Sequence, residues 1–289
     1  AAPSGACRHP VFLDQADDAF FDSRRPARPD GDEDWLRHAV LADGSVYIGD
    51  DEVFETVISP DGRQVRCSRR GDVDVRSFEA SLINFALAAS LTLRGEEPLH
   101  ATVVELSGQA IGLLGTSGAG KSTLAAYLVA DGAGLVTDDM LRITFAGERA
   151  LAHPGPHRLK LFDEPARRLL PRAAAQGHFS ALSGKVLIEP RATSAAPEPR
   201  PLAALFLLAA ADRRSVVRPT ARRVTGAKLI RLLIASAMDI RNAAPERLAR
   251  QLRFAERTAG VLPVYELCYR RDYDALAGAA DEIRRAVRS

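Results

Sequence analysis

The chain has 289 residues, of which 46% are hydrophobic and 26% charged, an ordinary composition for a globular protein with a buried core. Its formal net charge is only +2, with acidic and basic residues intermixed, so we expect neither a nucleic acid nor a membrane as partner. No apolar run reaches the ~18 residues of a membrane helix, and the N-terminus shows no secretory signal pattern. The cysteines are odd in number, far apart and in no metal or redox spacing, which favours the cytoplasm.

The N-terminal part of the chain is predicted to form a small domain of its own. Residues 1–34 are polar and interrupted by prolines, so we expect them to be largely loop. Alternating apolar residues separated by turn signals predict an antiparallel meander of three strands, at 46–48, 54–58 and 64–67. Residues 77–93 are apolar on nearly every helical face and precede Gly95, which predicts a buried helix. We therefore divide the chain into an N-terminal domain, 1–94, and a second domain, 95–289.

The second domain alternates strand and helix patterns, which predicts an α/β fold with a mixed sheet. Strands are expected at 99–106, 110–114, 135–137, 141–145, 148–152, 186–188, 202–209 and 264–269. Helices are expected at 123–129, 166–170, 225–241, 245–260 and 272–288. Residues 171–201 are rich in Pro, Ala and Gly, and they predict a long surface loop around one strand, of the kind that closes over a binding site.

One motif stands out in the second domain. Gly115 to Ser122 reads G-x-x-x-x-G-K-S, the phosphate-binding loop pattern, between a strand-like and a helix-like segment. That context directs backbone N–H groups and the positive end of a helix dipole at one point. The Lys121 ammonium would reach the β- and γ-phosphates of ATP, and the Ser122 hydroxyl would bind Mg²⁺. The residues expected to hold the nucleotide are Gly115, Thr116, Ser117, Gly118, Ala119, Gly120, Lys121, Ser122 and Thr123.

Two further features lie near this motif in the sequence. Asp138 and Asp139 end the next predicted strand, seventeen residues after the loop lysine. Adjacent residues at a strand end point to opposite sides, so one carboxylate can meet Mg²⁺ while the other meets a phosphate acceptor. Two solvated acids at a strand end are the alternative. His100 precedes the loop beside another predicted strand, and alone such a histidine is more often a core residue.

The order and spacing of these features resemble a known family. Residues 99–104, the loop 115–122 and the segment 137–139 are similar to the catalytic domain of bacterial HPr kinase/phosphorylase. They are closer to the HPr-kinase-like proteins found beside lasso-peptide and other peptide-tailoring genes. The resemblance covers residues 98–145, continues weakly through 154–162 and leaves out the N-terminal 90 residues. It implies a phosphate-loop kinase fold, related to the phosphoenolpyruvate carboxykinase core, that often forms homo-hexamers.

The resemblance also implies residue roles. Asp138 would be the general base that takes the proton of an acceptor hydroxyl, and His100 would assist it. Lys121 would hold the transferring phosphoryl group. The implied metal ligands are Ser122, Asp139 and Glu164, with Asp163 as the alternative to Glu164.

Departures from the family pattern bear on the substrate. Ala101 stands where the family has glycine after the histidine, and Thr123 stands where it has glutamate after the loop serine. The Gly-Leu-Gly segment that the full enzyme uses with its protein partner and for phosphorolysis is missing. We therefore expect an ATP- and Mg²⁺-dependent kinase that acts on a Ser or Thr hydroxyl of a peptide or small protein, such as a lasso-type peptide, rather than on HPr.

Two other functions stay open. A nucleotide-binding regulator or scaffold without transfer activity would use the same loop, and a phosphate-loop hydrolase or carboxykinase-like enzyme would also place acids at a strand end. Three basic residues, Lys160, Lys185 and Arg191, could meet phosphates or an acidic peptide, or could be solvated surface charges.

Overall fold

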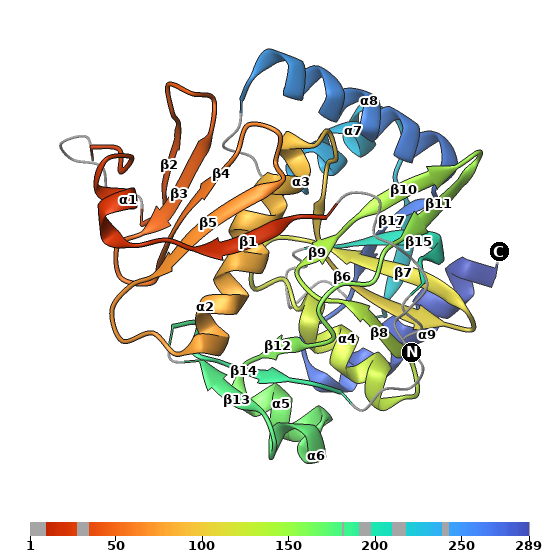
Figure 1. Ribbon diagram of the computed structural model, residues 1–289. Helices are drawn as coiled ribbons and strands as arrows, with labels where there is room; N and C mark the ends of the chain where they lie inside the picture. Colours follow the sequence, from red (N-terminus) through yellow and green to blue (C-terminus); the bar gives the residue numbers. More distant parts are fainter. Residues whose placement is uncertain are drawn as a thin grey trace, which may run out of the picture. The chain divides into compact units, whose positions relative to one another are not determined.

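The computed structural model describes residues 10–27, 35–180, 182–190, 198–209, 218–238 and 243–288. The internal contacts divide the chain into two compact units, residues 1–96 and 97–289 (Figure 1). Whether these units fold as separate domains, as the sequence predicts for 1–94 and 95–289, stays a prediction. Arg191 lies outside the described residues.

The described part of the first unit is built on a five-stranded sheet in the order β1-β5-β4-β3-β2. All neighbouring strands are antiparallel except β1 and β5, which are parallel. The predicted meander is confirmed as β3, β4 and β5, whereas the loop expected over residues 1–34 is wrong where β1 and α1 form. The elements are β1 (Phe12–Gln15), α1 (Asp18–Asp22), β2 (Arg37–Val40), β3 (Val46–Asp50), β4 (Phe54–Ile58) and β5 (Gln64–Arg69).

The missed strand β1 has no local signal because every one of its residues is exposed. Its backbone pairing with β5, more than fifty residues away, holds it instead. Helix α1 begins at Asp17, whose carboxylate accepts a hydrogen bond from the Phe20 N–H, and it buries Phe21 against the sheet. Both elements therefore depend on contacts with the sheet more than on their own sequences.

The predicted helix at 77–93 is confirmed as one continuous helical segment, with a π-helical middle. It consists of α2 (Val75–Ser81), the π-helix η1 (Leu82–Leu87) and α3 (Ala88–Leu93). Asp74 caps its start by accepting a hydrogen bond from the Ser77 N–H, and Gly95, at φ +87°, follows its end. Its apolar residues pack on one face of the five-stranded sheet.

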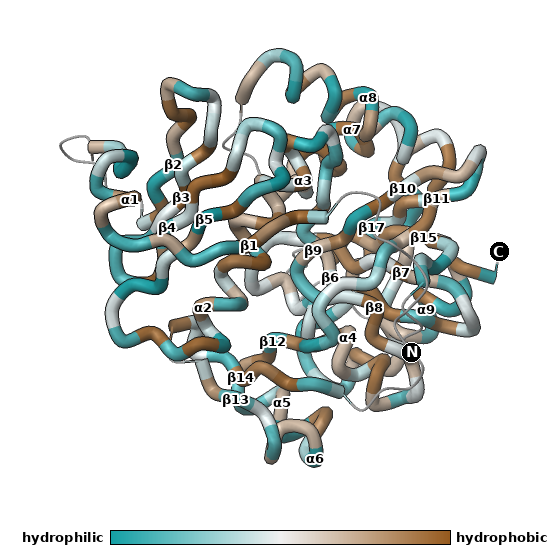
Figure 2. Tube along the Cα trace, viewed as in Figure 1, coloured by the Kyte–Doolittle hydropathy of each residue, from teal (hydrophilic) through white to brown (hydrophobic). Residues whose placement is uncertain are grey.

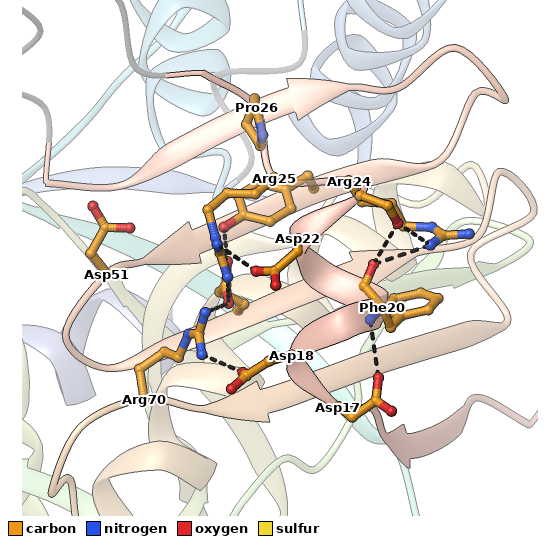
Figure 3. A network of polar contacts seen from close by, with 12 residues as sticks. Asp17, Asp18, Phe20, Asp22, Arg24, Arg25, Pro26, Asp51 and Arg70 are labelled. Carbon is orange, nitrogen blue, oxygen red and sulfur yellow. Dashed lines mark hydrogen bonds and ion pairs between the residues drawn. The ribbon is translucent and has the colours of Figure 1, made fainter.

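A buried carboxylate ties α1 to the other face of this sheet (Figure 3). Glu55, the second residue of β4, is only 1% exposed. The Arg25 guanidinium donates to both of its oxygens, at 2.6 and 2.9 Å, and the Tyr47 hydroxyl donates at 2.5 Å. Arg70 approaches the same carboxylate to 2.5 Å, and these partners lower the pKa of Glu55 against the effect of its burial. Two acids of α1 pair with the arginines in turn, Asp22 with Arg25 and Asp18 with Arg70.

Within the described residues, the second unit contains a nine-stranded mixed sheet, which confirms the predicted α/β class. Strands β7, β15 and β17 are parallel neighbours, and β6 lies between β7 and β8, antiparallel to both. The strands are β6 (Leu99–Leu106), β7 (Gln109–Leu114), β8 (Gly134–Thr137), β9 (Met140–Leu141), β10 (Ile143–Ala146), β11 (Arg149–Ala152), β15 (Arg200–Leu208), β16 (Thr220–Arg223) and β17 (Val264–Cys268).

Helices cover both faces of this sheet. Alternate residues of β7 point to opposite layers: Ile111 and Leu113 belong to the core under α4 and α9, and Leu114 to the core under α7 and α8. The central strands are correspondingly apolar along their length (Figure 2). The helices are α4 (Lys121–Ala130), α7 (Gly226–Ala235), α8 (Pro245–Val261) and α9 (Leu276–Arg288), the last preceded by the 3₁₀ turn η2 (Tyr273–Ala275). No helix in the described ranges is long and apolar enough to cross a membrane.

A three-stranded antiparallel sheet replaces much of the loop expected at 171–201. It has the order β12-β14-β13 and adjoins two short helices. The strand expected at 186–188 is confirmed as β14, but the loop expected around it is wrong where α6 and β13 form. Helix α6 packs against α5 and β14, and β13 pairs with β14. The elements are β12 (Leu159–Leu161), α5 (Asp163–Leu169), α6 (Pro171–Ala174), β13 (His178–Ser180) and β14 (Lys185–Ile188).

Helix α7 ends earlier than the predicted residue 241. The Ser236 carbonyl accepts a hydrogen bond from the His100 N–H at 2.7 Å, and Ala237 pairs with Leu99. The chain after Ala235 therefore bonds to the start of β6 instead of continuing the helix.

Candidate active site

The sheet topology brings the predicted site residues to one edge. Strands β7 and β8 run in the same direction because each is antiparallel to β6. Their carboxyl ends, and the amino end of β6 between them, therefore lie at the same edge of the sheet. The phosphate loop follows β7, the acid pair follows β8, and His100 lies at the start of β6. Ligands of open α/β sheets bind at such an edge.

The phosphate loop has the backbone that its sequence predicts. Gly118 and Gly120 adopt φ angles of +77° and +93°, in the left-handed region that favours glycine. Gly120 is also the N-cap of α4, so the first N–H groups of that ten-residue helix are directed into the loop. The strand, loop and helix predicted around the motif are thus confirmed as local structure.

Lys121 is folded onto this loop. It is only 6% exposed, and its ammonium donates to the Gly115 and Thr116 carbonyls at 2.8 and 3.1 Å. The ammonium also lies 3.0 Å from His100 Nε2. Burial lowers the pKa of Lys121. The cation is held at the mouth of the loop by acceptors that a phosphate oxygen can replace.

His100 is a partner of this lysine and of the acid pair. Its Nδ1 lies 3.1 Å from the backbone oxygen of Asp139, so the tautomer that fits carries its proton on Nδ1 and accepts from Lys121 at Nε2. Burial, followed by the Lys121 charge, lowers the pKa of His100. The structure therefore places a neutral imidazole between the loop lysine and the acid pair.

Asp138 is enclosed by the protein. Its Oδ1 accepts from the Thr102 hydroxyl at 2.6 Å and lies 3.4 Å from the Ser122 hydroxyl, and its Oδ2 accepts from the Lys160 N–H at 2.9 Å. Burial, followed by the charge of Asp139, raises the pKa of Asp138 to about 6. Sequence reasoning did not identify Thr102 or the Lys160 amide as partners of Asp138, because only the fold brings them to it.

Asp139 faces the other way, as expected for adjacent residues at a strand end. Its φ of +69° is in the left-handed region, which aspartate tolerates better than most residues. Its carboxylate pairs with the Lys160 ammonium at 2.6 Å, and this lysine lowers the pKa of Asp139 against the effect of burial. A non-glycine residue in this conformation is a frequent feature of functional sites.

His100, Lys121 and Asp139 line one cavity of about 140 Å³, called the phosphate cavity below. Besides the loop residues 117–123, its lining includes His100, Asp139, Lys160, Phe162 and Lys185. Three of the chain's four lysines, all of which lie in the described ranges, thus line one small cavity. Such a cluster of cations beside a helix N-terminus fits the charge of a triphosphate.

The residues around the phosphate cavity also fit Mg²⁺. In the described ranges, no three His, Cys, Asp or Glu side chains gather as a metal cage. Mg²⁺ does not need one, because it usually keeps several waters and binds through one or two carboxylates plus substrate phosphates. Ser122 and the acid pair supply that kind of donor set.

The structure separates Glu164 from this cavity. Its carboxylate accepts from the Tyr273 hydroxyl at 2.5 Å and lines a second, neighbouring cavity. Asp163 forms an exposed ion pair with Arg167 at 2.8 Å. The geometry brings His100, Lys121, Ser122 and Asp139 together but places neither Glu164 nor Asp163 with them, so a metal-binding role for either stays a prediction.

Comparisons with known proteins add little to this geometry. No protein-family model and no curated protein matches the chain. Among solved structures, the chain is similar to the HPr(Ser) kinase/phosphatase from Coxiella burnetii, with 11% sequence identity and a TM-score of 0.37, over 66% of this chain and 95% of that chain. A similarity at this level carries no functional argument.

Proposed function

We propose that this protein is a Mg²⁺- and ATP-dependent kinase that transfers the γ-phosphoryl group to a hydroxyl of a peptide or small protein. The observation that carries this proposal is the convergence of Lys121, His100 and Asp139 on one cavity at the mouth of a phosphate loop. The peptide nature of the acceptor rests on the family resemblance alone.

The chain's own groups would bind and orient the triphosphate. Backbone N–H groups of the loop and of the first turn of α4 would donate to the phosphate oxygens. The Lys121 ammonium would exchange loop carbonyls for the β- and γ-phosphates, and Lys160 and Lys185 would neutralise charge on the transferring group. Mg²⁺, held near Ser122 and an acid, would supply further charge neutralisation and hold the phosphates in place.

The contacts of the two acids favour an exchange of the roles predicted for them. Asp138 lies beside the Ser122 hydroxyl, has both oxygens engaged and does not line the phosphate cavity, which suits support of the metal side. Asp139 lines the cavity, which suits the acceptor side. We therefore propose Asp139 as the general base that accepts the proton of the acceptor hydroxyl. A general base must reach that proton, and reach is judged before pKa.

The reaction then balances in a single displacement. The acceptor oxygen forms a bond to the γ-phosphorus while the bond from that phosphorus to the β,γ-bridging oxygen breaks, and ADP leaves with the electron pair. The acceptor proton passes to the Asp139 carboxylate. In the loose transition states usual for phosphoryl transfer, positioning and charge stabilisation outweigh the strength of the base.

Incubation with γ-labelled ATP and candidate peptides tests the proposal. We expect label in a peptide hydroxyl, detected by mass spectrometry as the mass of one phosphoryl group. Lys121→Met should lower the rate by about 10²-fold or more, since it removes a cation aimed at developing charge. Lys228→Met is the matched control: Lys228 lies outside the cavity, in an exposed pair with Glu266, and its loss should leave the rate unchanged.

The same assay separates the alternatives. Release of free phosphate at the same rate with and without any acceptor would favour a hydrolase. Tight nucleotide binding with no label in any product would favour a regulator. Asp139→Asn should abolish transfer with nucleotide binding retained. Asp138→Asn should instead weaken the dependence of nucleotide binding on Mg²⁺, and the reverse pattern would restore the roles predicted from the sequence.

A further inference from the structure

A second cavity lies beside the phosphate loop, and none of the transfer chemistry uses it. Its volume is about 360 Å³, within the range of small-molecule sites. It shares Gly118, Gly120, Thr123 and Phe162 with the phosphate cavity, so the two cavities are neighbours along the loop. Its other side is formed by the chain just after β17, and we call it the β17 cavity.

The β17 cavity is lined by a tyrosine whose hydroxyl is open to it. Tyr269 is only 3% exposed, and no group in the described part of the chain forms a hydrogen bond with its hydroxyl. That hydroxyl lies 3.4 Å from the position that a Cβ on Gly120 would take. Burial raises the pKa of Tyr269 to about 12, so it is a hydrogen-bond donor at neutral pH. The hydroxyl is not among the buried polar atoms that lack a partner, so it is accessible from the cavity and can donate to a ligand oxygen there.

Two aromatic rings line the same cavity. Phe162 lies between Lys160 and Asp163 in the sequence, and its side chain is 56% exposed. Tyr273 is held by a hydrogen bond to Glu164 and by the Arg168 guanidinium, which lies 4.0 Å from its ring centroid. The exposed ring of Phe162 and the half-buried ring of Tyr273 lie beside a phosphate site, and aromatic rings in such a place are suited to stack on a nucleobase.

The direction of the loop decides which end of a nucleotide lies here. Lys121, the group for the β- and γ-phosphates, and Ser122, the candidate Mg²⁺ ligand, line only the phosphate cavity, whereas Thr123 lines both cavities. A triphosphate whose distal end is at Lys121 therefore has its α-phosphate and nucleoside toward the β17 cavity.

We infer that the β17 cavity binds the ribose and base of the nucleoside triphosphate, with Phe162 and Tyr273 stacking on the base and the Tyr269 hydroxyl donating to the ribose or α-phosphate. This inference rests on the proposed function. Glu164 is then a positioning residue that fixes the Tyr273 ring. Asp272, the other acid in the lining, already accepts from the Ala275 N–H and pairs with Arg270. Stacking reads the face of a base and not its edge, so ATP and GTP should bind within about tenfold of each other.

Calorimetry on the full chain with two probes, MgATP and magnesium tripolyphosphate, tests the inference. Phe162→Ala and Tyr273→Ala should each weaken MgATP about 5- to 100-fold and leave tripolyphosphate unchanged, because stacking is lost and phosphate contacts are kept. Tyr269→Phe should weaken MgATP about 2- to 10-fold. Glu164→Ala should weaken MgATP alone, whereas a metal ligand would weaken both probes.

Matched controls keep the outcomes distinct. Phe179, 58% exposed, and Tyr265, whose hydroxyl donates to Ala286, line neither cavity, so Phe179→Ala and Tyr265→Phe should leave both probes unchanged. The inference would be overturned by equal losses of affinity for both probes, by no loss of affinity for MgATP, or by a hundredfold preference for ATP or GTP. Each of these outcomes would leave the proposed function standing. Binding of neither probe to the unaltered chain would overturn both.

Discussion

The hydrogen bond from Thr102 to Asp138 offers a direct test of the site geometry. The Thr102 hydroxyl donates to Asp138 Oδ1 at 2.6 Å, and both residues are buried. Thr102→Val removes this donor and keeps the β-branched shape. Since a hydrogen bond to a charged acceptor is worth about 1.5–3 kcal/mol, we expect the free energy of unfolding to fall by about 2 kcal/mol.

The assay is denaturant unfolding at pH 8, where a carboxyl with a pKa of about 6 is ionised. Thr258→Val is the control, because the buried Thr258 hydroxyl donates to a neutral acceptor, the Phe254 carbonyl, at 2.8 Å. We expect the control to lose only about 1 kcal/mol, the usual contribution of a hydrogen bond between neutral groups.

A double-mutant cycle isolates the pair. Asp138→Asn removes the charge, so Thr102→Val should cost about 1 kcal/mol less in that background than in the unaltered chain. An equal cost in both backgrounds would show that the loss of stability comes from packing around Thr102. It would contradict a hydrogen bond from Thr102 to a charged Asp138.

Three further predictions concern stability. Glu97→Ala should lower the free energy of unfolding by about 3–5 kcal/mol, because it leaves the buried Arg247 without the carboxylate that lies 3.0 Å away. Glu266→Ala, which breaks the exposed pair with Lys228, should lower it by less than about 1 kcal/mol. Because the fold lowers the pKa of Glu55, this carboxylate contributes its full stabilisation above its usual pKa of 4.5, and the contribution is lost as the pH falls through the lowered pKa. Glu55→Gln should therefore flatten the acid limb of the pH–stability curve. Gly155→Ala should destabilise by about 1–3 kcal/mol, because the added Cβ would lie 2.1 Å from the Thr137 hydroxyl of β8.

Each of these measurements has an outcome that contradicts its reasoning. Equal losses of unfolding free energy for Glu97→Ala and Glu266→Ala would contradict the expectation that the buried pair contributes more than the exposed one. An unchanged acid limb in Glu55→Gln would contradict the lowered pKa. Gly260→Ala is the control for Gly155→Ala: it meets no atom within 4 Å in helix α8 and should stabilise by about 0.5–1 kcal/mol. A neutral Gly155→Ala would show that β8 can shift to accept the methyl group.

The sequence by itself determined the elements whose signals are local. Apolar alternation indicated β3 to β5, and the glycine pattern ending in Lys121 and Ser122 predicted a strand, a loop and a helix that the structure contains. The acid pair was placed correctly at the end of β8 for the same reason. All of these depend on residues within one turn or one strand of each other, where side-chain periodicity and glycine conformations act directly.

Only the tertiary structure decided which groups meet. The partners of Asp138 are Thr102, thirty-six residues before it, and the Lys160 N–H, twenty-two residues after it. Strands β1 and β12 likewise depend on pairing with distant strands, β5 and β14. Such contacts leave no periodic trace, because each partner's own segment reads as an ordinary strand or loop.

The roles of the two acids show the division most clearly. From the sequence, Asp138 and Asp139 are equivalent carboxylates on opposite sides of a strand end. The positive φ of Asp139 and the packing of β6 and β12 around Asp138 direct one carboxylate into the phosphate cavity and enclose the other. Burial and the charges nearby move their pKa values in opposite directions, and burial is a property of the assembled fold.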